Sequence, residues 1–527
     1  MCSSSNNLKL QAYMHIAAPS SADMAIPLVV LLPLLLVAWT VVVATYRLTF
    51  HPLAGIPGPK LAAITQFYQT FYSYYNNQSR FYQKVESLHA KYGPVVRITP
   101  DEVSLSDPEN YSTIYHVGTK YGKPDAYYHV FQAPGSFFTA ADNREHAKRR
   151  APVNPFFSRK GVLELEPVVQ EKAKVLLSKL RKDLDRASET PGGFVELQDL
   201  YSAISIDVAS DYSFDDCYNT LEKERYGRDF SDIVLGLLTS FWFFMQFKTI
   251  EALALSLPTW ISSALSPALK EYNKLVKGVR QNITNVKAQT LSQREKSQKR
   301  SIFHELLSAD PNRTVDDMTD IALSIVVAAA AATSNTLGIL SYNVISNPDI
   351  YRRLRAELLE AYPDDTQEMK WITLEKLPYL TAVIKESLRL AYGVIGRLPR
   401  VVPAGGATFN GYFLPAGTTV GMSSWMMHRT TSAFPDPDIF DPERWLDPEG
   451  SSKQHKYLVA FGKDSRQCIG MPLAYCELYV TVASVFRNFA DLEIRDTKPS
   501  DLVFNDYFSG YHPATATPLR VARRESK

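Results

Sequence analysis

The hydrophobic pattern of the chain begins with one long apolar run near the N-terminus. Residues 24–44 carry no charged side chain, and a helix of that length crosses the ~30 Å hydrocarbon layer of a membrane. Pro27 and Pro33 lie within the run, which membrane helices tolerate. The run is too long for a signal peptide, and no small-residue cleavage site follows it. We therefore predict a transmembrane anchor over residues 24–46.

The segments on either side of this run differ from it in composition. Residues 1–23 are polar and rich in Ser and Asn, which predicts disorder. Residues 47–60 contain several prolines, whose fixed φ angles predict a stiff hinge. Arg47 opens this hinge, and the positive-inside rule then places the bulk of the protein, the large domain expected over residues 61–527, in the cytosol.

Beyond the hinge, most long segments have helical spacing, and only short ones alternate as strands do. Residues 92–105 and 405–420 predict two hairpins. Residues 314–347 predict one uninterrupted helix, which begins at a capping box, ends at Pro348 and crosses the domain. Five alanines, residues 328–332, occupy its middle. The predicted fold class is mainly α with small β-sheets (α+β).

Composition favours one large domain. Hydrophobic residues make up 45% of the chain, enough for a full core, and no repeat or low-complexity linker divides residues 61–527. A net charge of +2 with mixed signs provides no basic surface for nucleic acid. The four cysteines are sparse, which indicates a protein of a reducing compartment.

Cys468 is the candidate for chemistry. It precedes a predicted helix over 469–489, and the N–H groups of a helix N-terminus, with the charge of Arg466, favour the thiolate. A thiolate can serve as a nucleophile, a redox group or an iron ligand. No second cysteine lies two or three residues away, which excludes a C-x-x-C pair, and zinc would need more ligands nearby. A sole cysteine ligand favours haem, and a buried core cysteine is the plain alternative.

Residues 461–470, Phe-Gly-Lys-Asp-Ser-Arg-Gln-Cys-Ile-Gly, resemble the haem-binding signature of the cytochrome P-450 superfamily. The resemblance implies a P-450 fold and a haem b cofactor, with Cys468 as the axial ligand of the iron. It also implies that Phe461 shields the sulfur, Arg466 faces a haem propionate and Gly470 lets the helix approach the ring. Asp464 departs from the signature, which usually has glycine at that position.

Further motifs occur in the order that the family has them. Residues 143–150 place His146 and Arg150 on one helix face, where the family grips a haem propionate. Arg400 matches a second propionate position. The E-x-x-R pair of the family and its partner arginine correspond to a buried structural lock, expected to serve folding, of Glu386, Arg389 and Arg444.

The resemblance also assigns an oxygen side to the site. The central helix of the family carries an acid before its threonine, and residues 329–334 align with that stretch. Thr333 would hold a water that delivers protons for O–O cleavage. Ala332 stands where the acid is usual, which leaves open an oxygen-independent haem-thiolate isomerase or dehydratase. The apolar residues 230–261 and the loop 507–511 would close the substrate cavity.

The details of these motifs look most like fungal P-450 enzymes of secondary metabolism, including the trichodiene-oxygenase type. They imply a single-pass protein of the endoplasmic reticulum that hydroxylates or epoxidises an apolar terpenoid, meroterpenoid or polyketide with O₂. No nucleotide-binding glycine loop or flavin segment is present, so electrons would come from an NADPH-cytochrome P-450 reductase, with cytochrome b5 as a further candidate donor. A membrane-bound haem sensor without turnover is another alternative.

Overall fold

A computed structural model describes residues 21–75, 79–214, 217–239, 241–265, 267–289, 301–329 and 331–524. The chain forms two compact units, Met1–Gly55 and Ile56–Lys527. Of the segment predicted to be disordered, residues 1–20 lie outside the described part of the chain.

The first unit contains helix α1 (Ser21–Thr49), which extends beyond both ends of the predicted anchor. Its stretch Val30–Thr49 is long and apolar enough to cross a membrane, and none of it is buried. A second stretch, Val315–Ser346, is also long and apolar enough, but about half of it is buried inside the protein. The first stretch is therefore the candidate anchor, and the second belongs to the core of the second unit.

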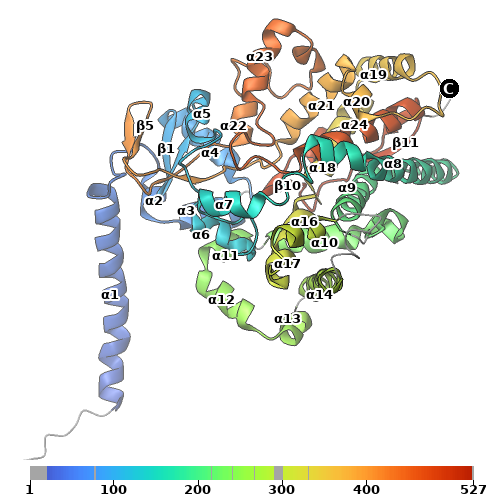
Figure 1. The fold of residues 1–527 in the computed structure, drawn as a ribbon. Coiled ribbons are helices and arrows are strands. Elements are labelled where there is room, and N and C mark those ends of the chain that lie inside the picture. The colour runs from blue at the N-terminus through green and yellow to red at the C-terminus, as the bar shows by residue number, and fades with distance from the viewer. Residues whose placement is uncertain are drawn as a thin grey trace, which may run out of the picture. The chain divides into compact units, whose positions relative to one another are not determined.

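The second unit is mainly helical with small sheets, as predicted (Figure 1). Its first helices are α2 (Lys60–Ile64), α3 (Phe67–Thr70), η1 (Phe71–Tyr75), α4 (Phe81–Tyr92), η2 (Pro108–Asn110), α5 (Tyr111–Ile114), α6 (Asp125–Tyr128), η3 (His129–Phe131), α7 (Asn143–Arg150), α8 (Arg159–Ser188), α9 (Leu197–Ser213), η4 (Thr220–Glu222) and η5 (Glu224–Gly227). Next come α10 (Arg228–Thr239), α11 (Phe241–Gln246), α12 (Lys248–Ser256), α13 (Thr259–Leu265) and α14 (Pro267–Ala288). The remaining helices are α16 (Ile302–Ala309), α17 (Val315–Ala329), α18 (Ala332–Ser346), α19 (Pro348–Ala361), α20 (Trp371–Leu374), α21 (Pro378–Ala391), α22 (Ser424–His428), η6 (Pro442–Trp445), α23 (Pro448–Tyr457), α24 (Met471–Asn488) and η7 (Pro499–Leu502).

The strands form four small sheets. The largest has the order β1 (Val95–Thr99), β2 (Glu102–Leu105), β7 (Thr419–Gly421) and β4 (Arg400–Val401), with only β2 and β7 parallel. The others pair β3 (Val195–Glu196), β11 (Arg520–Arg523) and β8 (Leu492–Ile494), then β5 (Ala407–Phe409) with β6 (Tyr412–Leu414), and β9 (Asn505–Tyr507) with β10 (Ser509–Tyr511). Both predicted hairpins are confirmed. Asn410 and Gly411 have φ +46° and +85°, the left-handed values that a tight hairpin turn between β5 and β6 needs.

Helix α18 lies in the core, packed against α9, α19, α21 and α24. Its side chains Leu337, Leu340 and Val344 are fully buried. Helix α24 packs in turn along α8. The loop with Cys468 enters α24, and Thr333 lies in the first turn of α18, so one core positions both halves of the candidate site.

The prediction of one uninterrupted helix over 314–347 is wrong. Helix α17 ends at Ala329 and α18 begins at Ala332, because Ala331 has φ −124° and ψ −41°, outside the helical region. The predicted start is correct, since the Asp317 backbone N–H donates to the Thr314 hydroxyl at 3.0 Å. A run of small apolar residues keeps the same periodicity on both sides of a break, so periodicity alone does not reveal the interruption.

The apolar segment 230–261 is divided among four helices, α10 to α13. Aromatic contacts join it to the N-terminal helices of the same unit. The rings of Phe67 and Phe247 lie 6.1 Å apart, and those of Tyr74 and Phe243 also lie 6.1 Å apart. The segment is therefore tied to α3 and η1 through ring contacts.

Candidate functional site

Cys468 lies in a loop that leads into α24. The loop turns back on itself, because the Cys468 backbone N–H donates to the Phe461 carbonyl oxygen at 2.9 Å. Gly462 has φ +72°, a left-handed conformation that glycine adopts at little cost. Gly470 is the N-cap of α24, and Pro472 suits its first turn, where a backbone N–H has no helical partner. These residues hold Cys468 just before the helix N-terminus.

The Cys468 side chain is exposed, although protein lies densely around it and desolvates the thiol. A Cβ atom added to Gly470 would meet no atom within 4 Å. Burial raises the pKa of the Cys468 thiol, and the backbone N–H groups of Gly470 and Met471 and the charge of Arg150 offset this only in part.

Two parts of the prediction for this thiol are therefore wrong. Desolvation outweighs the helix N-terminus, so the pKa of Cys468 lies above its ordinary value. The cation that acts on the sulfur is Arg150 and not Arg466, whose guanidinium donates to the carbonyl oxygens of Ala140 and Ala141. A bonded metal ion would keep such a sulfur deprotonated, because a coordinating thiol loses its proton.

Five basic side chains gather near the Cys468 loop, and we call them the basic cluster: Lys123, His146, Arg150, Arg400 and Arg466. Burial, then the charges of the other four members, lower the pKa of His146 to about 3, so this ring is neutral near pH 7. The cluster therefore brings four side chains that are cations in water into one buried region.

Helix α7 carries two members of the basic cluster. Its N-cap is Asp142, whose carboxylate accepts two backbone N–H groups of the first turn at 2.8 and 2.9 Å. His146 is buried, and Arg150, one turn later, donates to the Gln467 carbonyl oxygen at 2.6 Å. Arg150 thereby ties α7 to the residue that precedes Cys468.

Asp464 is the carboxylate of this region, and it stands where the family signature usually has glycine. One of its oxygens lies 2.8 Å from Nη2 of Arg400, and the other accepts the Arg466 backbone N–H at 2.9 Å. Both Asp464 and Arg400 are buried. The basic cluster contains four side chains that are cations in water, and Asp464 is the buried carboxylate beside them. The excess positive charge would suit a ligand that carries carboxylates.

The structure also brings Glu386, Arg389 and Arg444 together. Arg389 donates to both carboxylate oxygens of Glu386 at 2.7 and 2.9 Å, and Arg444 donates at 3.1 Å. Trp445 Nε1 and the Asp441 backbone N–H donate to the same carboxylate, each at 2.9 Å. Glu386 and Arg389 are completely buried. This lock is closed within the protein and contains no member of the basic cluster.

His428 was not predicted as a functional residue, although it connects the lock to the Cys468 loop. Its Nε2 accepts the Val459 backbone N–H at 2.9 Å, so Nδ1 carries the proton and donates to the Arg389 carbonyl oxygen at 2.7 Å. Burial lowers the pKa of His428 to about 3 and keeps the ring neutral. Nothing in its sequence neighbourhood signals this role, because its partners lie on distant segments.

Thr333, predicted to lie on the oxygen side, is the second residue of α18, which begins after the break at Ala331. The Ser334 hydroxyl donates to the Ala331 carbonyl oxygen at 3.0 Å, and the Asn335 amide donates to the Gly510 carbonyl oxygen at 2.7 Å. Asn335 therefore fastens α18 to the β9–β10 hairpin, the loop predicted to close the cavity. Among the described residues, no hydrogen bond joins Thr333 to the Cys468 loop.

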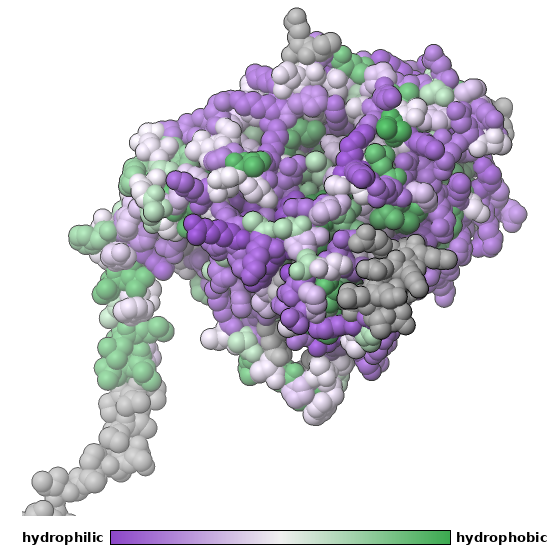
Figure 2. Space-filling model, in the orientation of Figure 1, coloured by the Kyte–Doolittle hydropathy of each residue, from purple (hydrophilic) through white to green (hydrophobic). Residues whose placement is uncertain are grey.

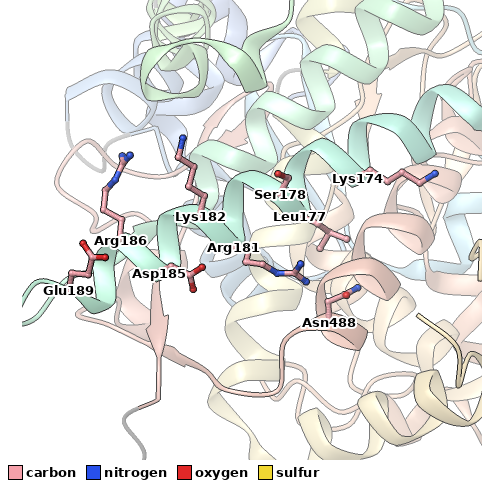
Figure 3. Close-up of a pocket in the computed structure, with 9 residues that line it drawn as sticks. All are labelled: Lys174, Leu177, Ser178, Arg181, Lys182, Asp185, Arg186, Glu189 and Asn488. Carbon is pink, nitrogen blue, oxygen red and sulfur yellow. The ribbon is translucent and has the colours of Figure 1, made fainter. Parts of the chain in front are cut away.

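An open surface groove of about 630 Å³ lies along α8 (Figure 3). Its side chains carry both signs of charge, with Lys174 and Arg181 beside Asp185 and Glu189. None of the predicted site residues lines it. The groove is therefore separate from the candidate site.

Comparison with known proteins identifies the family. The sequence profile of cytochrome P-450 matches residues 58–508. This chain belongs to the cytochrome P-450 family. It is 34% identical to cytochrome P-450 monooxygenase tpcC of Cochliobolus heterostrophus, over 95% of this chain and 99% of that protein. It is 33% identical to cytochrome P-450 monooxygenase astB of Aspergillus terreus, over 86% of this chain and 88% of that protein.

As a P-450, the protein is a haem-thiolate monooxygenase that requires O₂, a substrate and redox partners. The predicted family, fold class and enzyme class are confirmed. The described residues fit the haem, because Cys468 is exposed, a Cβ added at the nearby Gly470 would meet no atom, and the basic cluster has more cations than buried acids. A cofactor with one ligand position for sulfur and two propionates matches this donor set.

Proposed function

We propose that this P-450 is anchored once in the endoplasmic reticulum membrane and hydroxylates or epoxidises an apolar secondary metabolite of the terpenoid, meroterpenoid or polyketide type. NADPH supplies the electrons through a separate cytochrome P-450 reductase, with cytochrome b5 as a second donor. The anchor spans residues 24–46, the hinge 47–60 and the catalytic domain 61–527, which faces the cytosol. The observation that carries the proposal is Cys468 beside the basic cluster, in a chain similar to fungal monooxygenases.

In this proposal Cys468 would bind the iron of haem b, and the haem would supply the chemistry that activates O₂. Arg150, Arg400, Arg466 and His146 hold the propionates. Phe461 covers the sulfur, and Gly470 leaves room for the ring. Thr333, at the start of α18, holds a water and passes its proton toward the reacting oxygen. The lock of Glu386, Arg389 and Arg444 supports the loop without contact to substrate.

An exposed apolar surface supports an apolar substrate that arrives from a membrane. It lies on α3, η1, α12 and α13, and its members are Phe67, Phe71, Tyr74, Tyr75, Ile250, Leu253 and Trp260. Trp260 is 73% exposed and Tyr75 is 70% exposed, unusual values for aromatic side chains of a protein surface in water. Figure 2 shows white and green residues at the lower edge, where α12 and α13 lie. Such a surface suits contact with lipid.

Ala332 favours a second candidate function, an oxygen-independent isomerase or dehydratase. The family places an acid there to deliver protons during O₂ cleavage, and alanine has no proton to give. The neighbouring polar groups are directed to backbone oxygens, Ser334 to Ala331 and Asn335 to Gly510. A reaction that moves a substrate oxygen without reducing O₂ would not need the missing acid.

The deciding experiment incubates the purified full-length protein with reductase, NADPH and candidate substrates. The monooxygenase proposal expects a product that carries one atom of ¹⁸O from ¹⁸O₂ and turnover that stops without NADPH. Turnover without NADPH or O₂ would instead establish the isomerase. Cys468→Ala should abolish the red-shifted Soret band of the reduced carbon-monoxide complex, and Cys217→Ala, at a partly exposed cysteine, should retain it. Persistence of the band in Cys468→Ala would refute the ligand assignment.

A further inference from the structure

Two aromatic side chains lie in contact between the Cys468 loop and the surface, and we call Tyr392 and Trp425 the aromatic relay. Their ring centres are 4.9 Å apart. Tyr392 is buried, whereas Trp425 is partly exposed. Tyrosine and tryptophan lose one electron more readily than other aromatic side chains do. Two such rings in contact can therefore pass an electron between the protein interior and the solvent.

The inner end of the relay touches the Cys468 loop in two places. The Tyr392 ring stacks on that of His428 with centres 5.8 Å apart, and His428 Nε2 accepts a backbone N–H of the segment that enters the loop at 2.9 Å. Gly393 lies directly against Ala460, because a Cβ atom added to it would collide with the Ala460 carbonyl oxygen. The carbonyl oxygen of the residue after Ala460 accepts the Cys468 N–H at 2.9 Å. The relay is thus joined to the ligand residue through a short series of contacts.

The outer end of the relay has a proton acceptor. Trp425 Nε1 donates to a carboxylate oxygen of Glu86 at 2.9 Å, and 42% of the Glu86 side chain is exposed. Arg429 lies over the indole ring at 4.4 Å, and its charge is shared between Glu86 and Asp438. An indole that loses an electron becomes a strong acid, so Glu86 can take the N–H proton. The electron can then leave Trp425 without a positive charge remaining on the ring beside Arg429.

A second aromatic pair at the loop lacks such an outer end. The Tyr475 ring lies 5.2 Å from that of Phe461 and 6.3 Å from that of Tyr479. Tyr479 is buried, and its hydroxyl shares a hydrogen bond of 2.9 Å with the Thr381 hydroxyl, which is a poor proton acceptor. Of the two routes, the aromatic relay is the one that joins the loop to a carboxylate at the surface.

We propose that the aromatic relay conducts electrons from the surface to the haem site and so gives this P-450 a thiol-dependent peroxide reductase activity when no substrate is bound. The inference rests on the proposed haem site and adds a second activity to it. In each pass Trp425 gives one electron inward through Tyr392 and its N–H proton to Glu86. A thiol in solution then returns an electron to Trp425, and Glu86 returns the proton.

Two passes reduce one hydroperoxide. The hydroperoxide is the oxidant, and its O–O bond breaks to give an alcohol and water. The two thiols, each short of one electron, join in a disulfide, and their two protons are taken up by the alcohol and the water. The haem and the relay end unchanged, so an oxidising equivalent that no substrate consumes is discharged without damage to the protein.

The test mixes the substrate-free ferric holoprotein with cumene hydroperoxide and glutathione. Freeze-quenched wild type should show the electron paramagnetic resonance signal of a tryptophan radical, and Trp425→Phe should lack it. Trp425→Phe should also oxidise glutathione roughly tenfold more slowly, the change that a barrier higher by about 1.4 kcal/mol produces. Its haem should bleach faster, because the oxidising equivalents stay at the site. Trp260→Phe is the matched control, since Trp260 is a 73% exposed tryptophan outside the relay and should change none of these readouts.

Two further variants separate electron transfer from packing. Trp425→Tyr keeps an oxidisable ring and should recover most of the rate. Glu86→Gln keeps an oxygen that accepts the indole N–H but cannot take its proton, so glutathione oxidation should slow as it does in Trp425→Phe. If Trp425→Phe does not fold, Glu86→Gln takes its place in the rate measurement.

An unchanged rate of glutathione oxidation in Trp425→Phe and Glu86→Gln would overturn the inference, as would a radical signal that persists in Trp425→Phe. Either result would leave the haem site itself intact, since the reduced carbon-monoxide complex of the wild type would still show its red-shifted Soret band. A wild-type protein that binds no haem would instead overturn the proposed function.

Discussion

Two buried arginine clusters of this P-450 are built in opposite ways. In the lock, one carboxylate, Glu386, receives two arginines, a tryptophan N–H and a backbone N–H. The remaining N–H groups of Arg389 donate to backbone carbonyl oxygens, among them those of Pro437 and Ile439. In the basic cluster, one carboxylate, Asp464, stands among four side chains that are cations in water. The lock is complete by itself, and the basic cluster is not.

This difference separates a residue set that stabilises the fold from one that binds a ligand. Breaking a closed buried ion pair strands a charge, so the lock should be intolerant of substitution. Burial, and after it the like charges of the basic cluster, lower the pKa values of His146 and Lys123. Titratable groups with strongly shifted pKa values and no partner of opposite charge mark functional sites more often than fully paired groups do.

The largest expected effect comes from opening the lock. Glu386→Ala should lower the free energy of unfolding by about 3–5 kcal/mol, because the buried Arg389 would lose its carboxylate partner and Arg444 would keep only Asp441, 3.8 Å away. Urea unfolding of the purified protein measures this change. A loss below about 1 kcal/mol would show that backbone carbonyl oxygens and Asp441 can satisfy Arg389 and Arg444, and the contrast between the clusters would fail.

A buried acid without any cation extends the comparison. Glu477 on α24 is buried, lies 2.6 Å from the Ser205 hydroxyl and forms no ion pair among the described residues. Burial raises its pKa to about 7. The folded state therefore holds this proton more tightly than the unfolded state, and the free energy of unfolding should fall as pH rises from about 4.5 to about 7.

Glu477→Gln should remove the fall in the free energy of unfolding that the wild type shows as the pH rises. The free energy of unfolding of the variant, relative to that of the wild type, should rise by on the order of 3 kcal/mol between pH 5 and pH 8, because each unit of pKa shift corresponds to about 1.36 kcal/mol. Urea unfolding at both pH values measures the gain. Parallel pH profiles for the two proteins would mean that Glu477 is already ionised in the fold.

A smaller effect is expected in the basic cluster. Arg400→Met removes the partner of Asp464 but also relieves the repulsion that Arg400 exerts on Lys123 and Arg466. We expect a loss of about 1–2 kcal/mol in the haem-free protein, well below that of Glu386→Ala. A loss of stability as large as that of Glu386→Ala would show that no other cation replaces Arg400 beside Asp464. Arg400 and Asp464 would then form an isolated ion pair, closed like the lock.

The smallest effect is expected for an ion pair in water. Arg352 and Asp349 lie 2.8 Å apart on α19, with 75% and 85% of their side chains exposed. Arg352→Ala should change the free energy of unfolding by no more than about 0.5 kcal/mol. Arg352→Ala serves as the exposed reference for substitutions in the two buried clusters. A change above about 1 kcal/mol would show that burial does not determine the order of the stability losses.

Local patterns predicted much of this molecule from its sequence. Both hairpins, the helical class and the long apolar helix near the N-terminus follow from spacing and turn residues, and the signature around Cys468 identifies the family. The break at Ala331 was not predictable, because a short interruption leaves the apolar period on both sides unchanged. Burial of the Cys468 thiol was missed because desolvation depends on segments far away in sequence.

Lys123 and His428 were missed for the same reason. Each is positioned by partners that the fold brings from elsewhere, Lys123 by β4 and His428 by α21 and the segment before the Cys468 loop. Sequence spacing links residues along one helix face, and it carries no information on such long-range contacts. The departure at Asp464 was visible in the sequence, but its partner Arg400 became known only from the structure.

The neutral ring of His428 makes the folded protein less stable in acid. In the unfolded chain this histidine binds a proton below about pH 6.5, whereas in the folded chain it binds one only below about pH 3. The unfolded state therefore binds more protons between these pH values, and the free energy of unfolding falls as the pH falls through this range. Protonation of Nε2 would also remove the acceptor of the Val459 N–H and place a new cation beside Arg389. Acidification should therefore weaken the link between the Cys468 loop and the lock and lower the free energy of unfolding.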